Sequence, residues 1–184
     1  MIIYRIWSAE GYQRVLLADE DGYTAIRNTL RADPGRPAQG RWVPPRVRLL
    51  TEWQDERYRY ADLPWYSGYA MAVTRQARTV LEGIVANDAE FLPLECEQEE
   101  LWLMHPWKSV LAFDAAKSDF RLLPSGRINE VTRYAFLEAS VRGLACFTDL
   151  RLPTRLFVTD TVVTAINNSG LTGITFQQVW KSLS

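Results

Sequence analysis

The chain has 184 residues, of which 47% are hydrophobic and 23% are charged, a composition typical of a soluble globular protein with a sizeable core. The formal net charge is −1, so no excess of basic side chains favours binding to nucleic acid or to an anionic membrane, and we expect neither partner. One histidine and two cysteines offer little for a metal site or for disulfides, and no cofactor is expected.

The expected location is the cytoplasm. No apolar run reaches the roughly 20 residues that a membrane-spanning helix needs. Residues 1–7 lack the charged start, the long apolar stretch and the small-residue cleavage site of a signal peptide. Cys96 and Cys146 lie far apart and neither has a CxxC partner, which predicts free, buried thiols in a reducing compartment.

The N-terminus predicts a β-hairpin. Residues 2–7 and 12–18 are rich in β-prone side chains and are separated by a turn at 8–11 that contains glycine. We expect these two strands to pair with each other and the first of them to lie in the centre of a sheet.

A short helix and a further strand are expected next. Tyr23, Ile26 and Leu30 recur at helical spacing, and Asp21 could cap the start of this helix. A run of turn formers then leads to two prolines that exclude helix, and residues 46–50 resume a strand in which apolar and basic side chains alternate.

Residues 51–69, here called the aromatic segment, are crowded with tyrosine and tryptophan and show no clean periodicity. Because these side chains dominate the hot spots of protein interfaces, the segment predicts a protein-contact surface. The predicted partner-binding residues are Trp53, Tyr58, Tyr60, Trp65 and Tyr66. The alternative is an irregular segment that its rings hold over the core.

Two stretches of equal length share one pattern. In residues 155–180, a β-prone run leads to Thr159, a helix N-cap whose hydroxyl can accept a backbone hydrogen bond. A helix follows, ends at Asn-Asn-Ser-Gly, and gives way to a second strand after Gly173. Residues 70–95 align with this stretch without gaps, so that Thr74 matches Thr159. We expect two strand–helix–strand modules whose strands belong to one sheet.

The stretch between the modules predicts a hairpin and a paired strand. Glutamates alternate over residues 95–99 before an apolar run at 101–104, which indicates a hairpin with a solvated acidic turn at 98–100. That turn could alternatively imitate phosphate for a basic partner. Residues 128–136 alternate in polarity after a Pro-Ser-Gly turn and read as a strand with a partner.

The chemical inventory favours no catalytic role. His105 is the only histidine, and neither cysteine has a local nucleophile signature. The motifs of dinucleotide-binding loops, P-loops, zinc proteases and serine hydrolases do not occur. Asp114, Asp149 and Asp160 could converge on a metal, but nothing in their spacing argues for it, and caps and turns are the expected roles.

These elements together predict an α+β protein. The expected sheets are mixed and largely antiparallel, with a few short helices packed on them and with the two strand–helix–strand modules included. We expect a single domain, or two lobes at residues 1–69 and 70–184.

The most specific motif closes the chain. It consists of Phe157-Val158-Thr159-Asp160, then Gly170-Leu171-Thr172-Gly173, then Phe176 and Trp180. Together with a Tyr-Arg-Ile opening strand, a Trp-x-Pro pair at 42–44 and an apolar run at 110–114, it resembles the polymorphic-toxin immunity proteins of the myxobacterial type. The resemblance covers most of the chain, and the aromatic segment departs from it most.

The resemblance implies a cytoplasmic antidote, encoded beside a secreted or contact-delivered bacterial toxin, that binds this toxin and blocks it. The matching residues look like scaffold, so the resemblance carries over no catalytic residue. We hypothesise stoichiometric occlusion of the toxin, with the aromatic segment supplying the anchors. Two alternatives stay open: a hydrolase that reverses a toxin's covalent modification, and an adaptor domain without a toxin partner. The sequence leaves the oligomeric state open.

Overall fold

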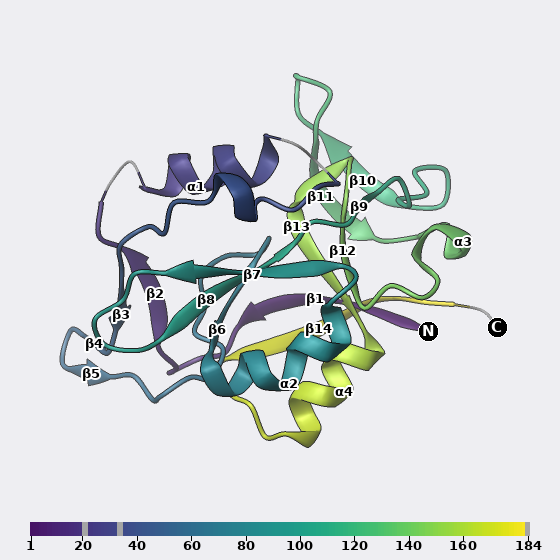
Figure 1. Cartoon of the computed structure of the whole chain (residues 1–184). Helices are drawn as coiled ribbons and strands as arrows, with labels where there is room; N and C mark the ends of the chain where they lie inside the picture. The colour runs from purple at the N-terminus through teal and green to yellow at the C-terminus, as the bar shows by residue number, and fades with distance from the viewer. Residues whose placement is uncertain (20–21, 33–34, 183–184) are drawn as a thin grey trace.

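The computed structural model describes residues 1–19, 22–32 and 35–182 (Figure 1). The strands are β1 (Ile2–Ser8), β2 (Arg14–Leu17), β3 (Val47–Leu50), β4 (Glu52–Trp53), β5 (Glu56–Arg57), β6 (Met71–Thr74), β7 (Ala89–Leu94), β8 (Leu101–Pro106), β9 (Ser109–Val110), β10 (Asp119–Leu122), β11 (Ile128–Arg133), β12 (Cys146–Asp149), β13 (Leu152–Thr159) and β14 (Ile174–Lys181). The helices are α1 (Gly22–Arg31), α2 (Arg75–Val85), α3 (Glu138–Val141), α4 (Asp160–Asn168) and the 3-10 turn η1 (Gln39–Arg41). The α+β prediction is confirmed. Each helix of the described residues is too short or too polar to cross a bilayer.

The longest strands form a five-stranded sheet in the order β14-β1-β13-β12-β9, antiparallel except for the pair β12 and β9. The predicted central position of the first strand is confirmed. The predicted N-terminal hairpin is wrong, because β2 pairs with β3 and not with β1. Ile3 and Ile6 of β1 are both buried, in two different apolar clusters, so β1 needs long neighbours and covered faces on both sides. The eight-residue strands β13 and β14 provide this, and the four-residue β2 cannot.

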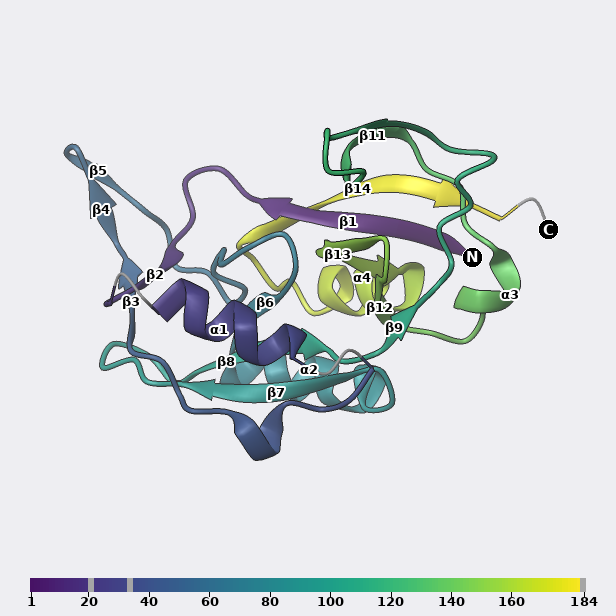
Figure 2. The same cartoon turned by 90° about the horizontal axis from the view of Figure 1, so that it is seen from above.

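A second sheet has three strands in the order β6-β8-β7. All six residues of β8 are buried, as expected for a central strand covered on both faces. β7 and β8 form the hairpin predicted around the acidic turn, with Leu94 opposite Leu101 at its closed end. Seen from above, β1 and β14 lie on one side of the molecule and β7 and β8 on the other (Figure 2).

The two modules have the same topology but belong to different sheets. β6, α2 and β7 make the first, and β13, α4 and β14 make the second. In each, two mutually parallel strands flank one antiparallel strand, which is β8 in the first module and β1 in the second. The prediction of one shared sheet is therefore wrong, because β6 and β7 lie in the three-stranded sheet and β13 and β14 in the five-stranded sheet. The connection between the two sheets is instead the packing of α2 against α4 (Figure 1).

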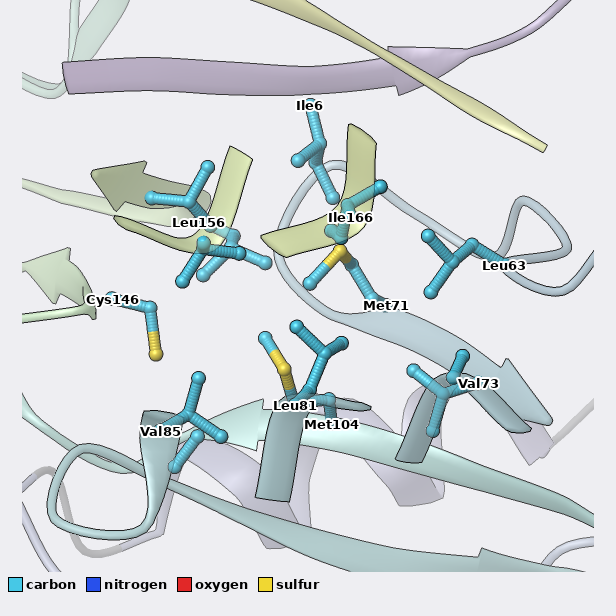
Figure 3. Close-up of a cluster of buried hydrophobic side chains, with 14 of the residues drawn as sticks. Ile6, Leu63, Met71, Val73, Leu81, Val85, Met104, Cys146, Leu156 and Ile166 are labelled. Atoms are coloured by element: carbon cyan, nitrogen blue, oxygen red, sulfur yellow. The ribbon is translucent and has the colours of Figure 1, made fainter. Parts of the chain in front are cut away.

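One apolar cluster joins the sheets and both helices (Figure 3). It includes Met71 from β6, Leu81 from α2, Met104 from β8, Leu156 from β13 and Ile166 from α4, each at most 2% exposed. Two further clusters lie under α1 with β2 and β3, and around the aromatic rings near β11 and β12.

The helices of the two modules begin after the predicted threonines, but only one of these threonines makes the expected capping hydrogen bond. Thr74 and Thr159 both occupy N-cap positions with extended backbone. The Thr74 hydroxyl accepts the Ala77 amide at 3.4 Å, whereas the Thr159 hydroxyl donates to the Ala145 carbonyl at 3.2 Å and makes no cap. The expected capping hydrogen bond of Thr159 is thus wrong, because its buried hydroxyl bonds to the Ala145 carbonyl and not to a backbone amide of α4. α1 forms as predicted, and its proposed cap Asp21 lies outside the described residues.

Candidate partner-binding surface

The aromatic segment begins with a small hairpin that extends from the body of the protein. β4 and β5 pair with each other, and the turn between them places Gln54 and Asp55 at positive φ. Trp53 on β4 is 59% exposed, and Tyr60 just beyond β5 is 51% exposed. Both rings are therefore accessible to a partner, and tryptophan and tyrosine are the residues most enriched in interface hot spots.

Tyr58, Trp65 and Tyr66 are only partly exposed. Trp65 packs against the cluster that joins the two sheets, and its backbone carbonyl accepts the Val15 amide at 2.8 Å. Tyr66 packs on the cluster under α1, its hydroxyl lies 3.2 Å from that of Tyr69, and burial raises its pKa. Trp65 and Tyr66 therefore help to hold the segment to the core. Their part in partner binding stays a prediction.

The surroundings of Tyr60 add polar and acidic groups to this surface. A shallow hollow beside its ring is lined by Thr74, Arg75, Thr79 and Glu99 from the start of α2 and from the acidic turn. Partial burial raises the pKa of Tyr60, and the Glu99 carboxylate contributes in the same direction. The aromatic segment and the acidic turn thus lie on one continuous surface.

Ion pairs hold both ends of the loop between β7 and β8. Glu95, which precedes the acidic turn, pairs with Arg46 at 3.5 Å, and Glu100 in the turn pairs with Arg75 at the start of α2. Gln98 accepts the Leu49 amide at 2.7 Å and so attaches the turn to β3. Because these contacts hold the turn in place, it is an ordered surface feature.

His105 is buried and bonded to a carboxylate. Its Nδ1 lies 2.9 Å from Oε1 of Glu90, and the same carboxylate accepts the amides of Ala38 at 2.6 Å and Gln39 at 3.0 Å. Burial by itself raises the pKa of Glu90, but the hydrogen bonds from His105 and from the two amides outweigh it and lower the pKa below its ordinary value. This arrangement fastens η1 to β7 and leaves His105 in a structural position.

The remaining reactive side chains are also engaged in the fold. Cys146 is fully buried, and burial, with the nearby Asp88 carboxylate, raises the pKa of its thiol so that the reactive thiolate is disfavoured. Cys96 is a free, half-buried thiol. No group of three or more histidine, cysteine or acidic side chains gathers in a metal-binding arrangement within residues 1–19, 22–32 and 35–182.

Asp114, Asp149 and Asp160, for which caps and turns were expected, all accept backbone amides, and Asp149 alone of the three is buried. Asp149 is fully buried and accepts the amides of Ala112 and Phe113, each at 2.7 Å, and of Arg151 at 2.8 Å. Asp114 accepts the Ala116 amide at 3.1 Å, and Asp160 accepts the Ile2 amide at 3.2 Å.

Two buried aspartates that also accept backbone amides were not predicted from the sequence. Asp62 accepts the backbone amide and the hydroxyl of Thr172, both at 3.0 Å, and Asp88 accepts the Ala145 amide at 2.7 Å. Asp62 lies between Ala61 and Leu63, whereas Asp88 follows Asn87, so only Asp62 has apolar residues on both sides to indicate its burial.

Comparison with known proteins identifies the chain at the level of its family. A family model described as an immunity protein family (Imm11) matches residues 9–181, which is nearly the whole chain. No curated protein matches the sequence. The match includes both modules, the aromatic segment and the closing motif on which the resemblance was based. The chain therefore belongs to the immunity protein family (Imm11), and the expected resemblance to toxin-immunity proteins is confirmed.

Proposed function

We propose that this protein is a cytoplasmic antidote that binds one cognate bacterial toxin and blocks it by stoichiometric occlusion. The observation that carries the proposal is the family match over residues 9–181, since an immunity protein acts against a toxin. The polymorphic, secreted or contact-delivered nature of that toxin is part of the proposal.

The arrangement of side chains supports binding over chemistry. His105 is engaged with Glu90, and Cys146 is buried with a raised thiol pKa. Large rings are exposed at Trp53 and Tyr60 instead, on a surface that the small β4–β5 hairpin and the acidic turn keep ordered. Tryptophan and tyrosine are enriched at the centres of protein interfaces, and polar and charged groups surround them at the rim.

Stoichiometry tests occlusion. A fixed amount of the toxin encoded by the adjacent reading frame would be titrated with the purified protein while the toxin's activity is followed. Occlusion predicts that protection saturates when the two proteins are equimolar, and that a complex of both can be isolated. Full protection at a small fraction of the toxin concentration would instead indicate a hydrolase that reverses the toxin's modification. No protection and no complex would leave an adaptor role.

Paired alanine variants test the aromatic segment. In the variant Trp53→Ala with Tyr60→Ala, the midpoint of thermal unfolding should stay close to that of the wild type, because both rings are exposed. Its affinity for the toxin should fall on the order of 30-fold, which corresponds to about 2 kcal/mol. The comparison variant, Trp65→Ala with Tyr66→Ala, should lower the unfolding midpoint, because these rings pack on the core. Unchanged affinity in the first variant would exclude its two rings as anchors.

A further inference from the structure

A second surface feature lies away from the β4–β5 hairpin of the aromatic segment. It is a groove of about 840 Å³ whose walls are α1, the tip of the β10–β11 hairpin and residues 150–155, where β12 turns into β13. We call it the basic groove. In Figure 1 the hairpin and α1 stand on the upper side of the molecule with the first half of β13 between them, and β4 and β5 lie at the lower left. In Figure 2 the hairpin that carries β11 again lies apart from β4 and β5.

The tip of the β10–β11 hairpin carries apolar side chains that lie on the surface and not in the core. Every residue from 121 to 127 is exposed, with Leu122 at 57% and Leu123 at 43%. Backbone hydrogen bonds close the turn, from Leu123 to Arg127 at 2.8 Å and from Gly126 to Leu123 at 2.9 Å, so the tip is ordered. Lower down, Phe120 packs edge-on against Phe113 at a ring distance of 5.6 Å and anchors the hairpin.

The groove continues this apolar surface with two more exposed side chains. Leu150 is 51% exposed on the floor, and Tyr23 is 44% exposed on the α1 wall. Isolated exposed apolar residues are ordinary, but apolar groups from three separate segments that meet in one hollow mark a contact site.

The charged side chains that line the groove are arginines, so the groove is positively charged. Four arginines line it, which are Arg27, Arg127, Arg151 and Arg155, and none of its lining residues among those described is acidic. Two of them are held in place: Arg151 donates to the Phe113 carbonyl at 3.0 Å, and Arg155 donates to the Asn129 carbonyl at 3.0 Å. The whole chain has a net charge of −1, so this positive region stands against an acidic excess elsewhere.

We propose that the basic groove docks an acidic, partly apolar segment of the toxin. This inference depends on the proposed function, because it assigns a surface and a chemistry to the same partner. Arginine forms bidentate hydrogen bonds with carboxylates, and the leucines and Tyr23 provide apolar area for the side chains between them. The charge of the groove attracts such a segment over a distance of about one Debye length.

Charge and shape favour a protein segment over nucleic acid. A nucleic-acid site of this size would rely mainly on phosphate contacts from a strongly basic face, and the acidic excess of the remaining surface opposes a polyanion that extends past the groove. Exposed leucines at the rim add nothing to phosphate binding, whereas they suit an apolar side chain of a protein partner.

The test reverses charge at the rim and measures toxin binding by calorimetry at two salt concentrations. Arg127→Glu should weaken affinity at least tenfold at low salt, because an exposed positive charge becomes negative opposite the acidic segment. Leu122→Asp should weaken it by a similar factor. The matched control is Arg142→Glu, an exposed arginine just after α3 that lines neither the basic groove nor the hollow beside Tyr60 and should bind as the wild type does. Arg127→Lys should keep most of the affinity.

Each outcome decides the inference. Normal affinity in both Arg127→Glu and Leu122→Asp, with wild-type binding intact, would overturn the groove and leave the proposed function standing. Failure of the wild type to bind the toxin at all would overturn both. A 20-nucleotide RNA or DNA that the wild type binds and Arg127→Glu releases would replace the acidic protein segment by a nucleic acid and so overturn the inference.

Discussion

The two strand–helix–strand modules have the same topology and the same threonine before the helix, yet they complete their sheets in different ways. The first module takes β8, which follows β7 directly in a hairpin, as its middle strand. The second takes β1 from the other end of the chain. A local sequence pattern therefore specifies a module, whereas the strand that pairs between its two strands comes from a different part of the chain in each case.

Matched positions in the two modules carry different side chains and make different contacts. The gapless alignment places Asp88 opposite Gly173 and Glu90 opposite Thr175. In the first module these positions carry buried acids that fasten neighbouring loops. In the second, Gly173 lies directly against the backbone of residue 63, and Thr175 is exposed on β14. Substitutions at matched positions should therefore have unequal effects.

Gly173→Ala should destabilise the protein most. A Cβ at this position would lie 2.4 Å from the Leu63 carbonyl oxygen and 2.7 Å from the Ala61 Cβ, and the backbone has φ +114°. Leu63 is held beside this glycine by the hydrogen bond from its amide to the Thr172 carbonyl at 2.9 Å, which opposes relief of the clash. We expect a loss of about 3 kcal/mol or more in the free energy of unfolding, measured by urea denaturation.

The matched control is Gly83→Ala in α2. No atom lies within 4 Å of the Cβ that this change adds, and the glycine is exposed within a helix. The variant should gain about 0.5–1 kcal/mol, because alanine is the better helix former. A similar loss in both variants would mean that the close approach at Gly173 has no special cost.

Glu90→Gln tests the acid that only the first module carries. At neutral pH the variant should lose about 1–2 kcal/mol of stability, because the side chain is buried and the charged acceptor of His105, Ala38 and Gln39 is removed. The folded state lowers the pKa of Glu90, so its stabilising effect is present above the ordinary glutamate pKa and is lost as the pH falls through the lower folded-state value. The difference between wild type and variant should thus shrink below about pH 4.

Urea midpoints from pH 7 to pH 3 measure this prediction. Thr175→Ala, at the matched exposed position in β14, should show no such pH dependence. A difference between Glu90→Gln and the wild type that stays constant or grows on acidification would contradict the role given to the carboxylate.

The two N-cap threonines give the smallest expected contrast. Thr74→Val removes the hydroxyl that accepts the Ala77 amide and should cost about 1 kcal/mol. Thr159→Val should cost about half as much, because the Ala145 carbonyl that its hydroxyl contacts still accepts the Thr159 amide at 2.9 Å. Chemical denaturation of both variants under one condition decides the order, and a larger loss at Thr159 would reverse it.

Short-range features could be predicted from the sequence by itself. Gly170 has the left-handed backbone, φ +66°, that ends α4 where the Asn-Asn-Ser-Gly run indicated, and the acidic turn closes the β7–β8 hairpin as expected. The closing motif, together with the looser matches before it, indicated the family. These signals are reliable because capping, turn geometry and side-chain periodicity act over a few neighbouring residues.

Only the tertiary structure decided which strands pair and which rings stay exposed. β1 prefers β13 and β14 to the nearby β2 because both of its faces need cover, a requirement that no local window contains. Trp53 and Trp65 look alike in the sequence, but only the second packs on the core. The basic groove joins Arg27 on α1, Arg127 at a hairpin tip and Arg155 on β13, and residues so distant along the chain meet only when long-range packing brings their segments together.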